Sequence, residues 1–162
     1  MAELTTLEEK LAEVTGLAMA AQGATEKVSG LVDDEELRRE LDRMNAEAKE
    51  TEERCTQLAE ELDGKKTAVL EKARETKQEA TEMMRTYLGS DAEGLDGFEF
   101  LVMAEAGEVG HWEVLGVLGE KAGKADVQEL VDWAVPIQQR HFRDAREGSL
   151  KLASEEDPNA EG

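Results

Sequence analysis

The two histidines of the chain carry its clearest chemical pattern. His111 follows Glu108 at a spacing of three residues, and His141 follows Gln138 at the same spacing. On an α-helix this spacing places both side chains on one face, about one turn apart. A carboxylate or amide oxygen and an imidazole nitrogen so placed can bind one metal ion inside a helical bundle. The pattern therefore predicts a divalent-metal site, with iron, manganese or zinc as the metal.

The ligand set follows from the positions on each helix face. At about 100° per residue, Glu108 falls near the centre of an apolar face and His111 points the same way, whereas Glu105 lies at its edge. We expect Glu108, His111 and His141 to be the main ligands, with Gln138 or Glu105 completing the set. The amide of Gln138 carries no charge, so the pair formed by Gln138 and His141 would bind the ion less tightly than the pair formed by Glu108 and His111. The earlier helices lack matching carboxylates on their apolar stripes, so a dinuclear site would be incomplete.

A second interpretation of the same residues involves no metal. Glu108, His111, Gln138 and His141 could form a buried hydrogen-bonded network that fixes the register of the helices. Other catalytic motifs are missing: there is no glycine-rich phosphate loop with lysine, no nucleophile elbow and no thiol pair. No catalytic residue is predicted, and an enzyme is the less favoured class.

Composition and charge restrict the partners. The 162 residues include 39 acidic and 19 basic side chains, a formal net charge of -20, which excludes a bare nucleic-acid binder. No apolar run reaches the ~18 residues that a bilayer span needs, and the acidic N-terminus lacks the basic and apolar regions of a signal peptide. The single cysteine, Cys55, lies in an apolar repeat and is interpreted as a buried structural thiol. These features predict a cytoplasmic protein that does not insert into membranes.

The elements that must position these residues are helices. Apolar residues recur at alternating spacings of three and four, which is typical of amphipathic helices. The stripes span residues 4–28, 37–62, 69–87, 98–122 and 127–152. The third stripe is the weakest, and two alternatives stay open: a mobile connection, or a second helix that runs on through Gly64. Pro136 is expected to kink or split the last helix.

Two helical hairpins joined by a connecting segment predict an all-α fold, an antiparallel four-helix bundle with a long helical crossover between the hairpins. Residues 1–153 form this single domain. A loop is expected over residues 89–97. Glycines at positions 107, 110, 116 and 119 are interpreted as points of close helix approach. Residues 154–162 lack an apolar stripe and are expected to be a disordered acidic tail.

Several short segments carry a resemblance to a known family. They are Glu50-Thr51, Gln57-Leu58-Ala59, Gly64-Lys65-Lys66 and Gly110-His111-Trp112-Glu113-Val114. With them, residues 35–153 resemble the ferritin-like bundles of the YciE/YciF type, bacterial proteins associated with stress. The resemblance implies a ferritin-like four-helix bundle and carries over His111 and Glu113.

The resemblance also implies a functional hypothesis. Gly110 stands where the family has Glu, and Gln138 and His141 stand near its acidic pair on the last helix. The chain is therefore expected to keep a reduced or vestigial divalent-metal site between its last two helices, with a role in bacterial stress response. The alternative is a non-enzymatic interaction or scaffold module, a homodimer or one bound to a protein partner, that associates through Met83, Met84 and Tyr87.

Overall fold

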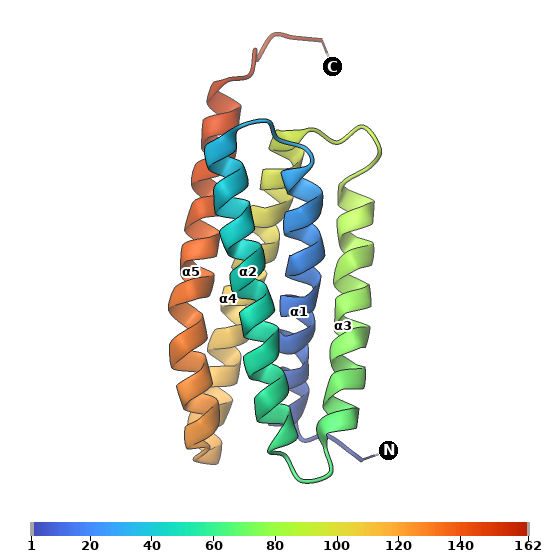
Figure 1. Ribbon diagram of the computed structural model, residues 1–162, viewed down its shortest axis with the longest axis vertical. Helices are drawn as coiled ribbons and strands as arrows, with labels where there is room; N and C mark the ends of the chain where they lie inside the picture. Colours follow the sequence, from blue (N-terminus) through green and yellow to red (C-terminus); the bar gives the residue numbers. More distant parts are fainter. Residues whose placement is uncertain (1, 162) are drawn as a thin grey trace.

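The computed structural model describes residues 2–161 as an all-α chain (Figure 1). Its five helices are α1 (Thr6–Ser29), α2 (Glu35–Glu60), α3 (Lys66–Tyr87), α4 (Gly94–Ala122) and α5 (Ala125–Ser154). The all-α class predicted from the apolar spacing is confirmed. None of the helices in the described range has the length and apolarity required to cross a bilayer.

Capping residues set where the first helices begin. The Thr5 hydroxyl accepts a hydrogen bond from the Glu8 N–H at 3.2 Å, and the Glu8 carboxylate accepts one from the Thr5 N–H at 2.8 Å. Asp34 caps α2 by accepting from the Leu37 N–H at 3.0 Å. These bonds satisfy N–H groups that have no partner within the helix, which fixes both starting points.

One expected boundary, between the second and third helices, agrees with the structure, and another differs. Gly64 has a φ of +71°, a left-handed conformation that interrupts helical geometry, so α2 and α3 are separate helices. The chain becomes helical at Gly94, four residues before the apolar stripe begins at Phe98. The Glu93 N–H donates to the Asp96 carboxylate at 2.8 Å, and this cap starts α4 inside the segment expected to be a loop.

The last helix is continuous through Pro136. A kink or a split was expected at this proline, and the split is wrong, because α5 extends from Ala125 to Ser154 without a break. Proline removes the N–H that would bond to the carbonyl of Asp132. Both residues are exposed, so water can solvate that carbonyl, while buried residues before and after it hold the helix against the bundle.

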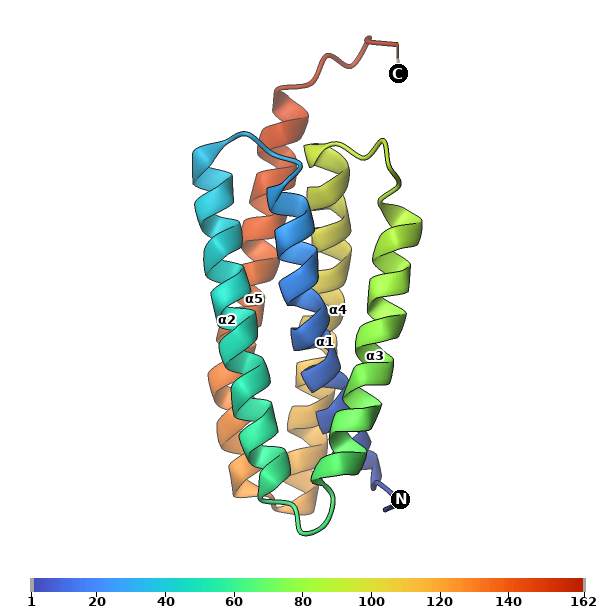
Figure 2. The ribbon, with the colours of Figure 1, turned by 45° about the vertical axis from the view of Figure 1, so that its right-hand side comes forward.

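Four of the helices form a bundle and the fifth lies outside it. α1 packs on α2 and α4, and α5 packs on the same two helices from the opposite corner. Each of these four runs antiparallel to its neighbours, whereas α3 lies along α1 in the same direction and returns the chain to the end where α4 begins (Figures 1 and 2). Beyond Ser154 the chain extends past that end of the bundle, as both views show.

Most of the core lies in two apolar clusters separated along the bundle axis, and a third, small cluster consists of Ala12, Ala59 and Val69. One cluster includes Val28, Leu37, Leu41, Met44, Phe98, Leu101 and Ala145. The other includes Leu11, Val14, Cys55, Leu58, Trp112, Leu115, Val131 and Ala134. Each of the four helices contributes residues to both clusters. The residues that lie between these two contributions are at mid-height in the bundle. On α4 and α5 the buried residues of that stretch are polar, so a layer of polar side chains divides the core; they are Glu105, Glu108, Gln138, His141 and Asp144.

Close helix approach depends on glycines at some of the expected positions only. A Cβ at Gly119 would lie 2.8 Å from Val127 Cγ1, and one at Gly116 would lie 3.1 Å from Val131 Cγ1, so α4 and α5 meet closely there. A Cβ at Gly107 or Gly110 would meet no atom within 4 Å. The interpretation of these last two as contact glycines is therefore wrong, because both are exposed and none of the described neighbouring helices lies against them.

Candidate functional site

The candidate site is the polar layer, which we define as Glu47, Glu105, Glu108, Gln138 and His141. Glu47 comes from α2, the two other glutamates come from α4, and the last two residues come from α5. Only 2% of the Glu105 surface and 6% of the Glu108 surface is exposed. Charged groups at such depth are costly unless they are paired or neutralised, so each member needs a partner.

His141 is the centre of the polar layer. Its side chain is 2% exposed, and its Nε2 atom lies 3.1 Å from Glu47 Oε1. A carboxylate can only accept a hydrogen bond, so Nε2 is the donor of this pair. On the other side of the ring, Nδ1 lies 3.8 Å from Glu105 Oε2. The imidazole therefore stands between carboxyl groups from two different helices.

Glu47 is already held by two partners. The Arg140 guanidinium and the His141 imidazole each form a hydrogen bond with its carboxylate. Burial raises the pKa of Glu47, but the hydrogen bonds from Arg140 and His141 outweigh that effect and lower the pKa below its ordinary value. Glu47 is therefore ionised at neutral pH and binds α2 to α5.

Glu105 and Glu108 form a pair of a different kind. Burial raises the pKa of Glu108 well above its ordinary value, and the nearby charge of Glu105 raises it further. Burial also raises the pKa of Glu105, although His141 and a hydrogen bond with Glu108 oppose the effect. The two carboxyl groups therefore lie close enough to influence each other, and Glu108 is the member whose pKa is raised further.

Two oxygens of the polar layer have no hydrogen-bond partner. They are Oε2 of Glu105 and Oε1 of Gln138, and both are buried. Beside the layer, the buried Nε atom of Arg140 also has no hydrogen-bond partner. A group that donates hydrogen bonds or carries positive charge would satisfy the two oxygens.

Of the five predicted ligands, the structure brings together Glu105, Glu108, Gln138 and His141. His111 is not buried with them: its side chain is 45% exposed, and its Nδ1 atom lies 3.5 Å from Glu13 Oε2 on α1. The expectation that His111 shares the buried face of Glu108 is wrong.

The buried stripe of α4 explains the position of His111. Its members are Leu101, Glu105, Glu108, Trp112 and Leu115. This stripe is rotated from the expected one, in which Glu108 lay near the centre with His111 on the same face and Glu105 at the edge. Trp112 takes the buried position after Glu108, because a large aromatic side chain gains more from burial than the neighbouring imidazole does.

The predicted metal ligands do not fit the arrangement of these side chains. His111 is not beside His141, and Glu47, the nearest further carboxylate, is already paired with Arg140. Among residues 2–161, no three His, Cys, Asp or Glu side chains are arranged to hold a metal ion. The metal site stays a prediction that would require side chains of the polar layer to rearrange.

Glu47 and Arg140 are members of the site that the spacing of residues along the chain does not reveal. Arg140 directly precedes His141, and it reaches the same carboxylate because α2 and α5 are neighbours. A second ion pair joins these helices where Arg43 Nη2 lies 2.8 Å from Asp144 Oδ2. The two residues of each ion pair are about a hundred residues apart in the chain, so no local sequence pattern could have revealed these contacts between α2 and α5.

A cavity adjoins the polar layer. It has a volume of about 210 Å³ and lies between α1, α3 and α4. Its apolar wall includes Leu17 and Ala21 of α1, Met83 and Met84 of α3, and Leu101 and Ala104 of α4. Glu105 and Glu108 also line it, and His111 lies at its rim. The carboxyl pair is therefore part of the wall of a mostly apolar cavity.

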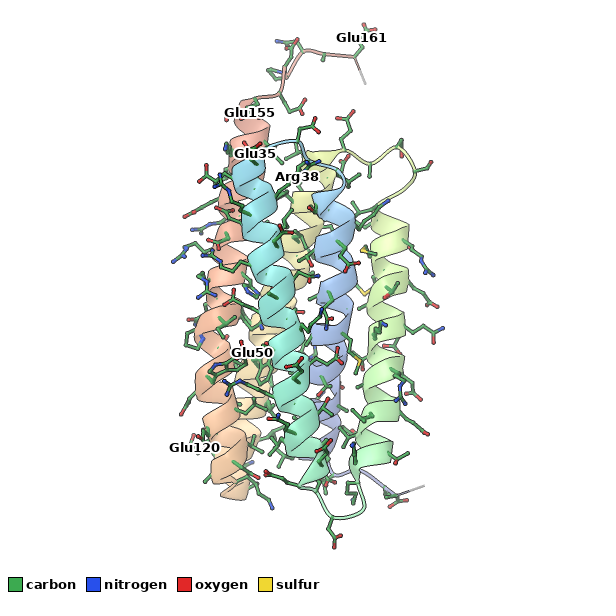
Figure 3. The ribbon with its side chains drawn as sticks, viewed as in Figure 1. Glu35, Arg38, Glu50, Glu120, Glu155 and Glu161 are labelled. Atoms are coloured by element: carbon green, nitrogen blue, oxygen red, sulfur yellow. The ribbon has the colours of Figure 1, made fainter. Side chains whose placement is uncertain are left out.

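Charge outside the polar layer is distributed over the whole length of the bundle. In Figure 3 labelled glutamates occur near both ends, with Glu35 and Glu155 at one end and Glu120 at the other. The field of a chain with net charge -20 attracts cations and repels anions.

Cys55 is fully buried, and burial raises the pKa of its thiol to about 12, in agreement with the structural role expected for it.

Comparison of the chain with models of protein families, with curated proteins and with solved structures gives no match. Its own geometry describes it as an all-helical domain of five helices with a buried polar layer beside an apolar cavity.

Proposed function

We propose that this chain is a binding protein that holds a small molecule in the cavity between α1, α3 and α4. The observation that carries the proposal is a mostly apolar cavity of about 210 Å³ with two buried carboxyl groups in its wall. An apolar cavity of about 150 Å³ is enough to bind benzene. Apolar walls with a few polar groups are typical of ligand sites.

The packing of α3 supports this proposal. Its buried residues are Ala68, Val69 and Ala73, all in its first half. The second half contributes Met83 and Met84 to the cavity wall, and methionine side chains adapt readily to the shape of a ligand. A segment with few buried contacts opens at lower cost than the rest of a fold. The second half of α3 is therefore the side from which a ligand enters.

Two glycines of α4 provide a matched test. Gly107 lines the cavity and Gly110 does not, and a Cβ at either would meet no atom within 4 Å. We expect indole or toluene to raise the unfolding temperature of the unmodified chain and of Gly110→Leu, and to have no effect on Gly107→Leu, whose side chain blocks the cavity. Absence of any effect on the unmodified chain, or an equal effect on both variants, would show that the cavity is not the site.

The ferritin-like architecture is part of the same proposal. Two antiparallel hairpins, with α3 returning the chain along the bundle, support the crossover connection that the resemblance implies.

A divalent metal in the polar layer is the second candidate function, and the unpartnered oxygens of Glu105 and Gln138 beside His141 favour it. Elemental analysis of protein purified without chelator tests it: near-stoichiometric iron, manganese or zinc that is lost in Glu108→Gln would support the metal, and metal-free protein that takes up no added ion would exclude it. The stress-response role stays a prediction.

A further inference from the structure

We propose that the cavity is selective for a cationic amine, a ligand with a small apolar body and an ammonium head group held by Glu105 and Glu108. This inference rests on the proposed binding function and names the ligand class. It follows from the composition of the wall, from the unsatisfied acceptor in it and from the charge around it.

Among the described residues, the wall of the cavity contains two carboxyl groups, those of Glu105 and Glu108, and neither lysine nor arginine. Arg140 forms its ion pair with Glu47 on another helix. A ligand that brings a positive charge into this cavity therefore meets carboxyl groups that no protein cation neutralises.

The hydrogen-bonding capacity of the wall also matches an ammonium group. Glu105 lines the cavity, its Oε2 atom is buried without a hydrogen-bond partner, and Nδ1 of His141 lies 3.8 Å from that oxygen. An ammonium group offers three N–H donors. Hydrogen bonds between an ammonium and a carboxylate are shorter and stronger than those between neutral groups. An alcohol of the same size would satisfy one acceptor at most and would leave the charge unpaired.

The size and surroundings of the cavity define the rest of the ligand. A volume of about 210 Å³ admits one aromatic ring with a short chain, or an alkyl chain of similar size. Met83 and Met103 line the cavity and are largely exposed, so the mouth is apolar. The net charge of -20 draws cations towards the molecule and repels carboxylates. The ligand class is therefore an arylalkylamine or a short alkylamine.

Three probes of nearly equal shape test the inference by isothermal titration calorimetry. They are 2-phenylethylamine, 2-phenylethanol and 3-phenylpropionate, which carry a cation, a neutral hydroxyl and an anion. We expect the amine to bind at least tenfold more tightly than the alcohol, and the carboxylate not to bind. Equal affinities for amine and alcohol would overturn the amine selectivity while leaving the binding function intact. Absence of binding by both would overturn the two together.

Variants of the carboxyl pair locate the selectivity. Glu105→Gln and Glu108→Gln keep the shape of the side chains, and each is expected to reduce the affinity for the amine to that for the alcohol, with the alcohol affinity changed less than threefold. Glu113→Gln, on an exposed residue of α4, is the control and should change neither affinity. An unchanged preference for the amine in both cavity variants would overturn the assignment of the carboxyl pair.

Two measurements on the unmodified chain remain decisive even if a variant does not fold. Nuclear Overhauser contacts between the ring of 2-phenylethylamine and the methyl groups of Met83 and Met84 are expected, and contacts confined to another surface would overturn the site. Treatment with a chelator should leave the amine affinity unchanged. Loss of amine binding after chelation would instead assign the polar layer to a metal.

Discussion

At the scale of single residues, Glu108 sets a pH dependence of stability. Its pKa is raised in the folded chain by burial and by the charge of Glu105. The folded state therefore binds this proton more firmly than the unfolded state does. The contribution of Glu108 to stability is full below its ordinary pKa and is lost as the pH rises towards the folded pKa. The carboxyl pair thus makes the fold less stable at neutral and alkaline pH than a neutral pair would.

Replacing Glu108 by glutamine removes this titration. We expect Glu108→Gln to increase the free energy of unfolding at pH 8 by about 1 kcal/mol or more, since one pKa unit corresponds to about 1.4 kcal/mol. The gain should shrink towards pH 5. Urea denaturation across this range, compared with Glu113→Gln on the surface, measures the difference. A gain that does not change with pH would contradict the proposed titration.

The two histidines should differ in their effect on stability, although the sequence presents them alike. His111→Ala removes an exposed side chain and a long contact to Glu13, so its cost is expected to stay within about 0.5 kcal/mol. His141→Ala leaves a cavity and removes a hydrogen bond to Glu47, and a cost of about 2 to 4 kcal/mol is expected. Urea denaturation of both variants at pH 7 gives the comparison. Equal costs would show that the two side chains have similar surroundings.

At the scale of helices, the contact between α1 and α3 depends on Gly16. A Cβ at this position would overlap the carbonyl oxygen of Ala73 and lie 2.7 Å from Thr76 Cβ. A backbone carbonyl within a helix cannot move aside alone, so the whole of α3 must shift. α3 has few buried residues beyond this contact, which makes it the helix most easily displaced from the bundle.

We therefore expect Gly16→Ala to loosen α3 while the other helices stay folded. The free energy of unfolding should fall by about 1 to 3 kcal/mol. Amide hydrogen exchange should become faster across residues 66–87 and stay near its original rate in α4 and α5. Gly23→Ala, in the same helix but with no atom within 4 Å of the added Cβ, is the control. Uniformly faster exchange in all helices would mean that α3 is an inseparable part of the bundle.

At the scale of the whole molecule, helix periodicity predicted most of the architecture. Stripes at alternating spacings of three and four correspond to the five observed helices, including the weak third one. The order of the helices predicted two hairpins and a helical crossover, because consecutive helices joined by short turns pack as antiparallel neighbours. The start of α4 was misplaced, since its first turn depends on a cap by Asp96 and not on apolar residues.

The candidate site was predicted in part. Helix geometry correctly predicted that Glu108, Gln138 and His141 are buried. Polar residues are rare on an apolar stripe because their burial is costly, so these positions can be recognised in the sequence. Helix geometry failed for His111, because α4 is rich in glycine and alanine between the two apolar clusters. Such residues mark neither face of a helix clearly, and an error of one position turns the face by about 100°.

The sequence by itself determined which segments are helical, that polar groups interrupt the core, and that the molecule is strongly acidic. These properties depend on local spacing and on composition. Only the tertiary structure decided that Glu47 and Arg140 surround His141, that His111 faces solvent, and that a cavity lies beside the carboxyl pair. Those features depend on the rotation of each helix about its axis and on the distance between helices, and both are set by packing between residues far apart in the chain.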